Sequence, residues 1–368
     1  MRIERLEARG FRNLQALTLD LTARATVLRG ANAQGKTNVL EALYVCATGR
    51  SFRNAAPREL IAHDQPRARL ASRFERQNVR HDVEVVIDEK RRGMQVDGRA
   101  LTRTSKLLQL VNVVAFFPDD LRIAKGSPEE RRRFLDRAVG NYRADFVDAA
   151  TSYAKVLKTR NALLRAERAP DPQMLAVYDE QLVQHGVVVH MSRQAALQEL
   201  APTAQKYFAA IMQEATHMHI ELEGGLGGDT AVADSDYVSV FAERLRTGYP
   251  RDRARGVTSV GPHRADLLMR VNDRDARGFA SQGQQRALVL ALKLAEVETV
   301  GQKLETMPVL LLDDVSSELD AERSRLLFST IDALGCQTLV STTGATVLPF
   351  ASDTRIYDVR AGALAVAA

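Results

Sequence analysis

One stretch of eight residues, Gly30-Ala31-Asn32-Ala33-Gln34-Gly35-Lys36-Thr37, constrains the fold of this chain most strongly. It matches the phosphate-loop pattern G-x-x-x-x-G-K-[ST] at every fixed position. Residues 25–28 are typical of a short buried strand, and residues 38–47 are typical of a helix packed inside a domain. Because the motif requires strand, loop and helix in this order, the sequence predicts a nucleotide-binding α/β core.

The loop has the chemistry of a phosphate site. Its backbone N–H groups and the positive end of the following helix form a cradle for anions. We expect Lys36 to reach the β- and γ-phosphates and the Thr37 hydroxyl to ligate Mg²⁺. The alternative is a glycine-containing turn that matches by chance, and the motifs further along the chain weigh against it.

A second motif supplies carboxylates. The apolar segment 307–312 ends in Asp313 and Asp314, which is typical of a buried strand that opens into a phosphate-loop site. A carboxylate at the end of such a strand can hold the Mg²⁺ hydration shell beside Thr37, so we expect Asp313 to do this. Asp314 is placed to orient or deprotonate the attacking water. Paired aspartates are also common in turns, but here they accompany a complete phosphate loop.

The third motif is Ser281-Gln282-Gly283-Gln284-Gln285, directly before a segment at 286–298 that we expect to be an amphipathic helix. It keeps Ser-x-Gly-x-Gln, the skeleton of the ABC ATPase signature. A Ser hydroxyl, a Gly N–H and the positive end of the helix make a second anion site. In the ABC superfamily this site serves the γ-phosphate held by the other subunit. The motif therefore predicts that ATP is clamped between two heads.

Composition excludes several classes of protein. Hydrophobic residues make up 45% of the 368 residues, and no apolar run reaches the roughly 20 residues that cross a bilayer. Residues 1–5 carry charges where a signal peptide needs an apolar segment, so we expect a cytoplasmic protein with no membrane association. Cys46 and Cys336 have no metal-binding spacing and are expected to be packed. The net charge of +5 is a mild bias toward polyanions.

The order of strand-like and helical patterns predicts three segments. Residues 1–125 form the N-terminal part of an ATPase head, with a small antiparallel sheet beside the nucleotide-binding core. Residues 126–250 are mostly helical and form an inserted arm lobe. Residues 251–368 return to the strand-like pattern and complete the head with the segment 281–285 and the strand-end carboxylates.

The inserted lobe has recognisable starts and stops. Ser127-Pro128 followed by two glutamates is typical of a helix start. No heptad pattern is long enough for an extended coiled coil, so we expect short antiparallel helices. Breaks between them are expected at Pro170 and Pro172, at Pro202, and at 224–228.

Several motifs together resemble the RecF family of bacterial recombination mediators, which are SMC- and Rad50-like ATPases. They are the phosphate loop, the segment 281–286, Asp313-Asp314 followed by Ser317-Glu318-Leu319-Asp320, and Gly261-Pro262-His263-Arg264. Residues 49–53 and 126–136 also resemble the family. The motifs fall in order over nearly the full length of the chain.

The resemblance implies an α/β fold: an ABC-type (SMC/Rad50-like) P-loop ATPase head with an inserted, mostly α-helical lobe. It implies weak DNA-stimulated ATPase activity with ATP and Mg²⁺ as cofactors, and an ATP-dependent homodimer. It also implies binding to double-stranded DNA beside single-stranded DNA at gap junctions. The implied partners are RecR, with RecO and indirectly RecA, in gap repair, replication-fork maintenance and SOS induction. Such a protein would be nucleoid-associated.

The resemblance assigns roles position by position. The phosphate loop binds the triphosphate, the strand-end carboxylates serve Mg²⁺ and water, and the signature acts in trans. A D-loop crosses the dimer interface, and a Phe-Arg-Asn segment lies near the nucleotide in SMC-like heads. The residues at these places are, in the same order, Gly30 to Thr37; Asp313 and Asp314; Ser281, Gly283 and Gln285; Asp320; and Arg12 with Asn13.

Two positions depart from the ABC pattern. Many ABC ATPases carry Glu where this chain has Asp314, and the shorter carboxylate fits slow turnover. The usual switch histidine after the last core strand is absent, and Thr343 stands near its place, so no switch residue is assigned. His263 lies beside Pro and Arg, where a lone histidine is more often structural.

DNA-contacting residues are not determined by the sequence. Arg131-Arg132-Arg133 lies in a predicted helix, where successive side chains fan out by about 100°, so a solvated face is the better interpretation. Arg251, Arg253 and Arg255, in a predicted loop, could line a phosphate track. No basic stretch is interleaved with aromatic residues, so we expect backbone contacts without sequence reading.

Three other functions compete with a DNA-repair clamp. The ATP-binding subunit of a transporter also carries a helical lobe at this place, so fold alone does not separate the two. A chromosome organiser of the SMC type would need long heptads. A nuclease of the overcoming-lysogenisation-defect type would need a further acidic domain after Ala363. The full set of RecF-like motifs favours the repair clamp.

Overall fold

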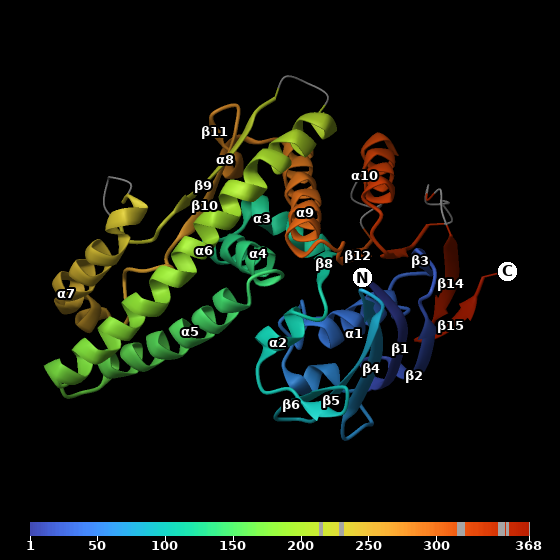
Figure 1. The fold of residues 1–368 in the computed structure, drawn as a ribbon, viewed down its shortest axis with the longest axis horizontal. Helices are drawn as coiled ribbons and strands as arrows, with labels where there is room; N and C mark the ends of the chain where they lie inside the picture. Colours follow the sequence, from blue (N-terminus) through green and yellow to red (C-terminus); the bar gives the residue numbers. More distant parts are fainter. Residues whose placement is uncertain (213–215, 228–231, 315–320, 345–349, 351–352, 368) are drawn as a thin grey trace. The chain divides into compact units, whose positions relative to one another are not determined.

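The computed structural model describes residues 1–212, 216–227, 232–314, 321–344, 350 and 353–367 (Figure 1). Contacts divide the chain into two compact units, Met1–Leu121 with Val289–Ala368, and Arg122–Leu288. The second unit extends beyond the lobe expected at 126–250. The reason is a strand pairing: β10 (Asp266–Val271) pairs antiparallel with β9 (Met218–Glu223) of the lobe.

A six-stranded sheet forms the centre of the first unit, in the order β15-β14-β3-β13-β12-β8. Strands β14, β3, β13, β12 and β8 are parallel, and β15 is antiparallel. The buried strands predicted at 25–28 and 307–312 are confirmed as β3 and β12, and nearly every residue of β3, β12, β13 and β8 is buried. The bounds are β3 (Ala25–Arg29), β8 (Val113–Phe116), β12 (Val309–Asp313), β13 (Thr338–Thr342), β14 (Thr354–Arg360) and β15 (Ala363–Val366).

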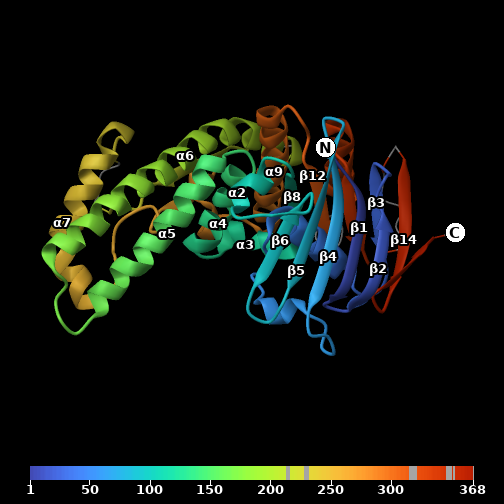
Figure 2. The same ribbon diagram turned by 60° about the horizontal axis from the view of Figure 1, so that its bottom comes forward.

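A second sheet in this unit is antiparallel, and β6, β5, β4, β1 and β2 follow one another across it in Figure 2. The small antiparallel sheet predicted from the sequence is therefore confirmed. Its last turn, Asp97-Gly98, has positive φ at both residues, as a two-residue hairpin requires. The bounds are β1 (Arg2–Phe11), β2 (Leu14–Asp20), β4 (Ala68–Arg76), β5 (Val79–Ile87), β6 (Arg92–Val96) and β7 (Arg99–Ala100).

Helix α1 (Lys36–Thr48) contacts strands of both sheets. Its residues Val39, Leu40 and Leu43 are fully buried in the core of the unit. This enclosed position explains why the segment is apolar on most of its circumference. It also fixes the start of α1, where the phosphate loop ends, against the central sheet.

The second unit is built on two long antiparallel helices, α5 (Ala144–Arg165) and α6 (Pro172–Met212), which lie side by side in Figure 1. Helix α4 (Pro128–Gly140) begins as predicted, with a capping box in which the Ser127 N–H donates to Glu130 Oε2 at 2.6 Å. The expectation of short helices was wrong for α6, which has 41 residues.

The break expected at Pro202 was also wrong. Proline removes one helical N–H donor and crowds the carbonyl of the preceding turn. Pro202 lies on the exposed side of α6, where water can satisfy that carbonyl. Leu200, Ala204 and Phe208 are buried around it and hold the helix in place by packing.

Helix α7 (Tyr237–Arg255) runs through Pro250 to the end of the basic segment. Arg251, Arg253 and Arg255 are thus helical, and the loop predicted for them was wrong. Helix α9 (Gln282–Leu304) is buried on all sides from 287 to 297, so the amphipathic pattern expected there was wrong as well. The other elements are α2 (Thr104–Leu108), α3 (Arg122–Lys125), β11 (Arg274–Asp275), α8 (Ala276–Phe279) and α10 (Ala321–Leu334), with 3₁₀ turns at Pro57–Leu60, Pro118–Leu121 and Asp234–Asp236.

Across the described part of the chain, no helix has both the length and the apolar composition needed to cross a membrane.

Candidate nucleotide-binding site

The phosphate loop connects β3 to α1 in the first unit. Ala33 and Gly35 have φ values of 64° and 110°, in the left-handed region. A Cβ at Gly30 would lie 2.4 Å from the Val359 carbonyl oxygen, and one at Gly35 would lie 2.8 Å from the Asn13 side-chain amide. Both glycines are therefore required by the space that the loop occupies.

Two neighbouring turns hold this loop in place. The Gly362 N–H donates to the Gln34 carbonyl at 2.8 Å, and the Ala361 N–H donates to Gln34 Oε1 at 2.7 Å. Asn13, from the turn between β1 and β2, lies against the loop, and its Oδ1 accepts a bond of 2.8 Å from Asn38 Nδ2. The backbone of the loop is thus fixed by the chain itself, so its N–H groups are preorganised.

Arg12 has a different place from its neighbour Asn13. Its Nε and Nη2 each lie 3.0 Å from a carboxylate oxygen of Glu41 in α1, and its Nη1 donates to the Glu59 carbonyl at 2.8 Å. Glu41 is fully buried and also accepts a 2.5 Å bond from the Ser51 hydroxyl. Asn13 therefore contacts the phosphate loop directly, whereas Arg12 contacts the helix that follows it.

Lys36 is buried and turned toward its own loop. Its Nζ donates to the carbonyls of Gly30 at 2.7 Å and Ala31 at 2.8 Å. Burial lowers the pKa of Lys36, and the nearby carboxylates of Asp314 and Asp313 partly oppose this. The ammonium group thus lies inside the loop, where a phosphate can replace the two carbonyls as its hydrogen-bond acceptor.

Two hydroxyls meet at the Asp313 carboxylate. Thr37 Oγ1 donates to Asp313 Oδ1 at 2.8 Å, and Ser341 Oγ donates to the same oxygen at 2.6 Å. The Asp314 N–H in turn donates to Ser341 Oγ at 3.0 Å and to the Ser341 carbonyl at 3.1 Å, while Asp314 has a left-handed φ of 50°. Ser341 thus positions the side chain of Asp313 and the backbone of Asp314.

The donor set around Thr37 suits Mg²⁺. A hydroxyl and a carboxylate are hard oxygen ligands, and the hydrogen bond between Thr37 and Asp313 brings them within reach of one ion. Within the described ranges, no group of three or more His, Cys, Asp or Glu side chains could hold a metal. Mg²⁺ would therefore be held by Thr37 and Asp313 together with nucleotide phosphates.

Sequence reasoning missed Ser341, because its contact with Asp313 depends on the pairing of β12 with β13, which sets the two residues opposite each other. We predict that Ser341→Ala lowers ATP turnover about tenfold, since removing a residue that orients a metal ligand typically costs 10–100-fold in activity. The affinity for ATP should change less than threefold. Steady-state ATPase assays and equilibrium nucleotide binding measure the two effects.

Thr26→Val is the matched control for Ser341→Ala. Thr26 lies on β3 and is buried like Ser341, but its hydroxyl makes no hydrogen bond within the described chain. Its replacement should leave turnover unchanged. Equal turnover in Ser341→Ala and wild type would show that Ser341 does not position the carboxylates.

The signature motif lies in the second unit, at the start of α9. The Ser281 N–H donates to Gln284 Oε1 at 2.9 Å, and the Gln284 N–H donates to Ser281 Oγ at 3.2 Å, which is a capping box. Ser281 is exposed, and its hydroxyl donates to no described residue, so it can donate to a phosphate oxygen. Gln285 Nε2 instead donates to the carbonyls of Ala276 at 3.5 Å and Ala280 at 3.3 Å, within the same unit.

Three predicted positions remain, and one of them lies outside the described residues. Gly283 is half-buried in the first turn of α9, and Thr343 is exposed after β13. Asp320 and the rest of the segment 317–320 lie outside the described residues. The D-loop assignment therefore stays a prediction.

His263 has a structural environment in the second unit. Its Nε2 lies 3.0 Å from the Thr258 carbonyl, which can only accept, so this nitrogen carries the proton. Its Nδ1 therefore accepts the Tyr153 hydroxyl at 2.6 Å. Burial lowers the pKa of His263 to about 4, with the Thr258 contact opposing this. The neutral ring fastens the loop 261–264 to α5.

This pKa predicts a loss of stability in mild acid. Unfolded chains protonate histidine below about pH 6.5, whereas folded His263 stays neutral down to about pH 4. The unfolded state therefore binds more protons in this window, and the free energy of unfolding falls as the pH drops from 6.5 to 4. The expected loss from His263 is about 3 kcal/mol by pH 4. Denaturant titrations of wild type and His263→Gln at pH 7 and 4.5 should show a shallower pH dependence in the variant, and an identical dependence would contradict the assignment.

The basic residues considered for DNA are engaged within the second unit. Arg131 is buried, and its Nε and Nη2 bind the Asp266 carboxylate at 2.7 Å each. Arg132 donates to the Ala265 carbonyl, and Arg133 pairs with Glu129. Arg251 binds the Ser259 hydroxyl, and Arg253 binds carbonyls at the end of α5. These contacts give most of the two candidate groups a structural role, and the solvated face expected for Arg131 was wrong because its side chain is buried against Asp266.

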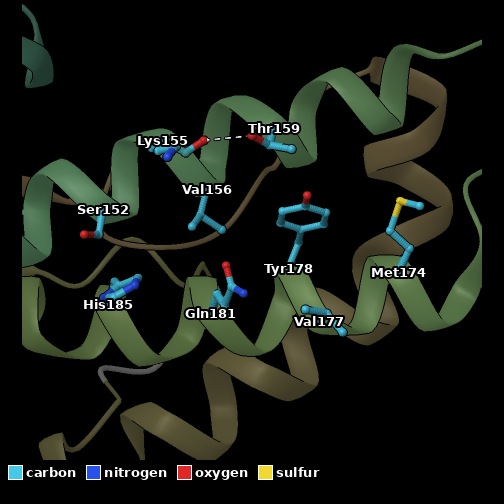
Figure 3. A pocket seen from close by; sticks show the side chains of 9 residues that line it. All are labelled: Ser152, Lys155, Val156, Thr159, Met174, Val177, Tyr178, Gln181 and His185. Carbon is cyan, nitrogen blue, oxygen red and sulfur yellow. Dashed lines mark hydrogen bonds between the residues drawn. The ribbon is translucent and has the colours of Figure 1, made fainter.

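A separate pocket of about 530 Å³ lies between α5 and α6 (Figure 3). Polar and apolar side chains share its lining, and the Thr159 hydroxyl donates to the Lys155 carbonyl at one edge. No residue of the phosphate loop, the strand-end carboxylates or the signature lines it. The lining residues are Ser152, Lys155, Val156, Thr159, Met174, Val177, Tyr178, Gln181 and His185.

The chain is similar in sequence to known proteins over nearly its full length. A family model described as RecF/RecN/SMC N terminal domain matches residues 2–363. A protein of Myxococcus xanthus named "DNA replication and repair protein RecF" is 41% identical, with 100% of this chain and 98% of that protein covered. A protein of Citrifermentans bemidjiense with the same name is 39% identical, with 93% of each chain covered.

Solved structures give the same result. A structure of the recombination mediator protein RecF with ATP, in the RecFOR pathway, has a TM-score of 0.91 and 28% identity, and the match covers 100% of this chain and 98% of that one. A head domain of Smc bound to a winged-helix domain of ScpA has a TM-score of 0.57 and 17% identity over 100% of this chain and 97% of that one, which shows a shared fold.

Proposed function

Because this chain belongs to the RecF family, DNA replication and repair proteins among the RecF/RecN/SMC ATPases, we propose that it is an ATP-dependent recombination mediator. It binds ATP with Mg²⁺ and acts on duplex DNA beside single-strand gaps. It works with RecR and RecO to load RecA in gap repair, fork maintenance and SOS induction. The relatives' names and the RecFOR pathway of the solved RecF structures support these partners.

The observation that carries this proposal is the preorganised phosphate loop. The turn at 361–362 is hydrogen-bonded to Gln34 of the loop, Asn13 lies against the loop, the Lys36 ammonium is buried within it, and Thr37 is hydrogen-bonded to Asp313. Mg²⁺ would supply positive charge to the phosphates, and the triphosphate would supply the bond to the γ-phosphate that is hydrolysed. The chain supplies amide donors, one ammonium group and two carboxylates at fixed positions.

Asp314 is proposed to orient or deprotonate the attacking water. Its backbone is fixed by two hydrogen bonds from its N–H to Ser341. The side chain is one methylene shorter than the glutamate of many ABC ATPases. The shorter carboxylate supports slow turnover, and we propose a weak, DNA-stimulated ATPase that serves as a dimerisation switch rather than as a fast catalyst.

ATP is proposed to join two copies of the chain. Ser281 and Gly283 at the start of α9 would bind the γ-phosphate held by the partner's phosphate loop. The exposed Ser281, its free hydroxyl proton and the N-terminal end of a helix support this role. Gln285 would act in trans through its side-chain oxygen, since its nitrogen holds the turn at 276–280. Asp320 is proposed to cross the same interface.

Asp314→Asn tests the proposal. The amide keeps the size of the side chain but is not a base, so turnover should fall on the order of 100-fold, the lower end of what a positioned base contributes. ATP binding should stay within threefold of wild type, and the ATP-bound dimer should persist for longer. ATPase assays and sedimentation with ATP measure these effects. Unchanged turnover would remove Asp314 from the mechanism, and failure of wild type to bind ATP would refute the proposed function.

A further inference from the structure

The antiparallel sheet of the first unit brings together arginines that are far apart in the sequence. Arg9 of β1 lies directly opposite Arg69 of β4 in the strand register. Ala8, which precedes Arg9, and Leu70, which follows Arg69, lie on the opposite face of the sheet. Their exposed fractions are 0% and 2%. Residues on alternate faces of a strand point in opposite directions, so Arg9 and Arg69 share the solvent face.

Two like charges at directly opposite positions destabilise a sheet. The side chains of Arg9 and Arg69 form no hydrogen bond or ion pair with the described residues. Arg67, exposed just before β4, is also without such a partner in the described chain. We name Arg9, Arg67 and Arg69 the β1–β4 arginine cluster.

Two other arginines of the same sheet are paired with carboxylates. Arg73 pairs with Asp82 at 2.8 Å, and Arg80 pairs with Glu4 at 2.9 Å. Two residues further along on the same face, Ala71 of β4 lies between Glu7 of β1 and Glu84 of β5. Glu7 forms an ion pair with Arg5 at 2.9 Å. The cluster therefore leaves an excess of positive charge at one end of a rigid surface.

We propose that the β1–β4 arginine cluster binds the phosphate backbone of duplex DNA. This inference rests on the proposed function and names the surface that it requires. Facing guanidinium groups match a row of phosphates, which bind arginine through two parallel N–H bonds. Strand positions fix the spacing of the guanidinium stems without presenting groups to base edges, so the contact is independent of sequence. A polyanion also removes the repulsion between Arg9 and Arg69.

The double variant Arg9→Gln/Arg69→Gln tests this. Duplex affinity should fall about tenfold or more in 0.1 M salt, and the slope of log K against log salt should fall by about 2, since each lost phosphate contact accounts for roughly 0.9. The melting temperature should stay the same or rise, because the variant removes a like-charge pair. ATP binding should be unchanged.

Arg73→Gln/Arg80→Gln is the matched control, because it removes the same charge from the same sheet but from arginines that already have acidic partners. Its salt slope should change by less than half as much. Equal affinity and slope in the two double variants would overturn the cluster as a DNA surface. A lost ATP-dependent dimer with unchanged DNA binding would assign the cluster to a second copy of the chain and also overturn it. If wild type bound no duplex DNA, the proposed function itself would fail together with this inference.

Discussion

Replacing Lys36 with alanine is expected to weaken ATP binding about 100-fold or more. The ammonium group is already buried in the loop, where its hydrogen-bond partners among the described residues are the carbonyls of Gly30 and Ala31, and a phosphate would be a far stronger partner. Truncating one member of a desolvated charge pair costs about 2–5 kcal/mol or more, which corresponds to roughly 30- to several-thousand-fold in affinity. Calorimetric titration with ATP and Mg²⁺ measures the change.

The control for this variant is Lys158→Ala. Lys158 is exposed on α5, so this substitution removes one positive charge at a position outside the phosphate loop. ATP affinity of the control should equal that of wild type. The folded state of Lys36→Ala is checked by its melting temperature without nucleotide. If a folded Lys36→Ala bound ATP within threefold of wild type, the loop would not be the phosphate site.

Replacing Ser281 with arginine is expected to abolish ATP-dependent dimerisation without weakening ATP binding. The hydrogen bonds of Gln34 in the phosphate loop and of the adjacent Asn13 are not made to Ser281, so the nucleotide should still bind. The long cationic side chain would occupy the start of α9, where the partner's γ-phosphate is proposed to dock. Sedimentation velocity with ATP and Mg²⁺ should show monomer for the variant and dimer for wild type.

Two controls separate the loss of the hydroxyl from other effects of the substitution. Ser281→Thr keeps both the hydroxyl and the helix cap, and should still form dimers. Ser239→Arg places an arginine at an exposed position of α7 in the same unit, and this variant should dimerise with ATP like wild type. Normal dimerisation of Ser281→Arg with ATP would show that the signature does not act in trans.

The parts of the site that the sequence could predict are those in which the chemistry requires neighbouring residues. The phosphate loop needs its glycines, Lys36 and Thr37 at fixed spacing, and the left-handed backbone at Gly35 follows from that local pattern. The strand that ends in Asp313 is likewise a local pattern. Short apolar runs predicted β3 and β12 for the same reason.

The parts that could not be predicted depend on contacts between distant segments. Ser341 meets Asp313 through the register of β12 and β13, and Arg9 meets Arg69 through the register of β1 and β4. The low helix propensity of proline predicted that a helix ends at Pro202. In the structure α6 runs through this residue, because the packing of the buried Leu200 and Phe208 stabilises the helix on both sides of it. In the same way, the buried pairing of Arg131 with Asp266 could not be read from three consecutive arginines.

The central claim is that one ATP is held by the phosphate loop of one copy and the signature of another. Mixing Lys36→Ala with Ser281→Arg tests it most directly, because a heterodimer would contain one site with an intact loop and an intact signature. Sedimentation with ATP and Mg²⁺ should show each variant alone as a monomer and the mixture as a dimer that contains one ATP. A mixture that stays monomeric at every concentration where wild type forms dimers would contradict the claim.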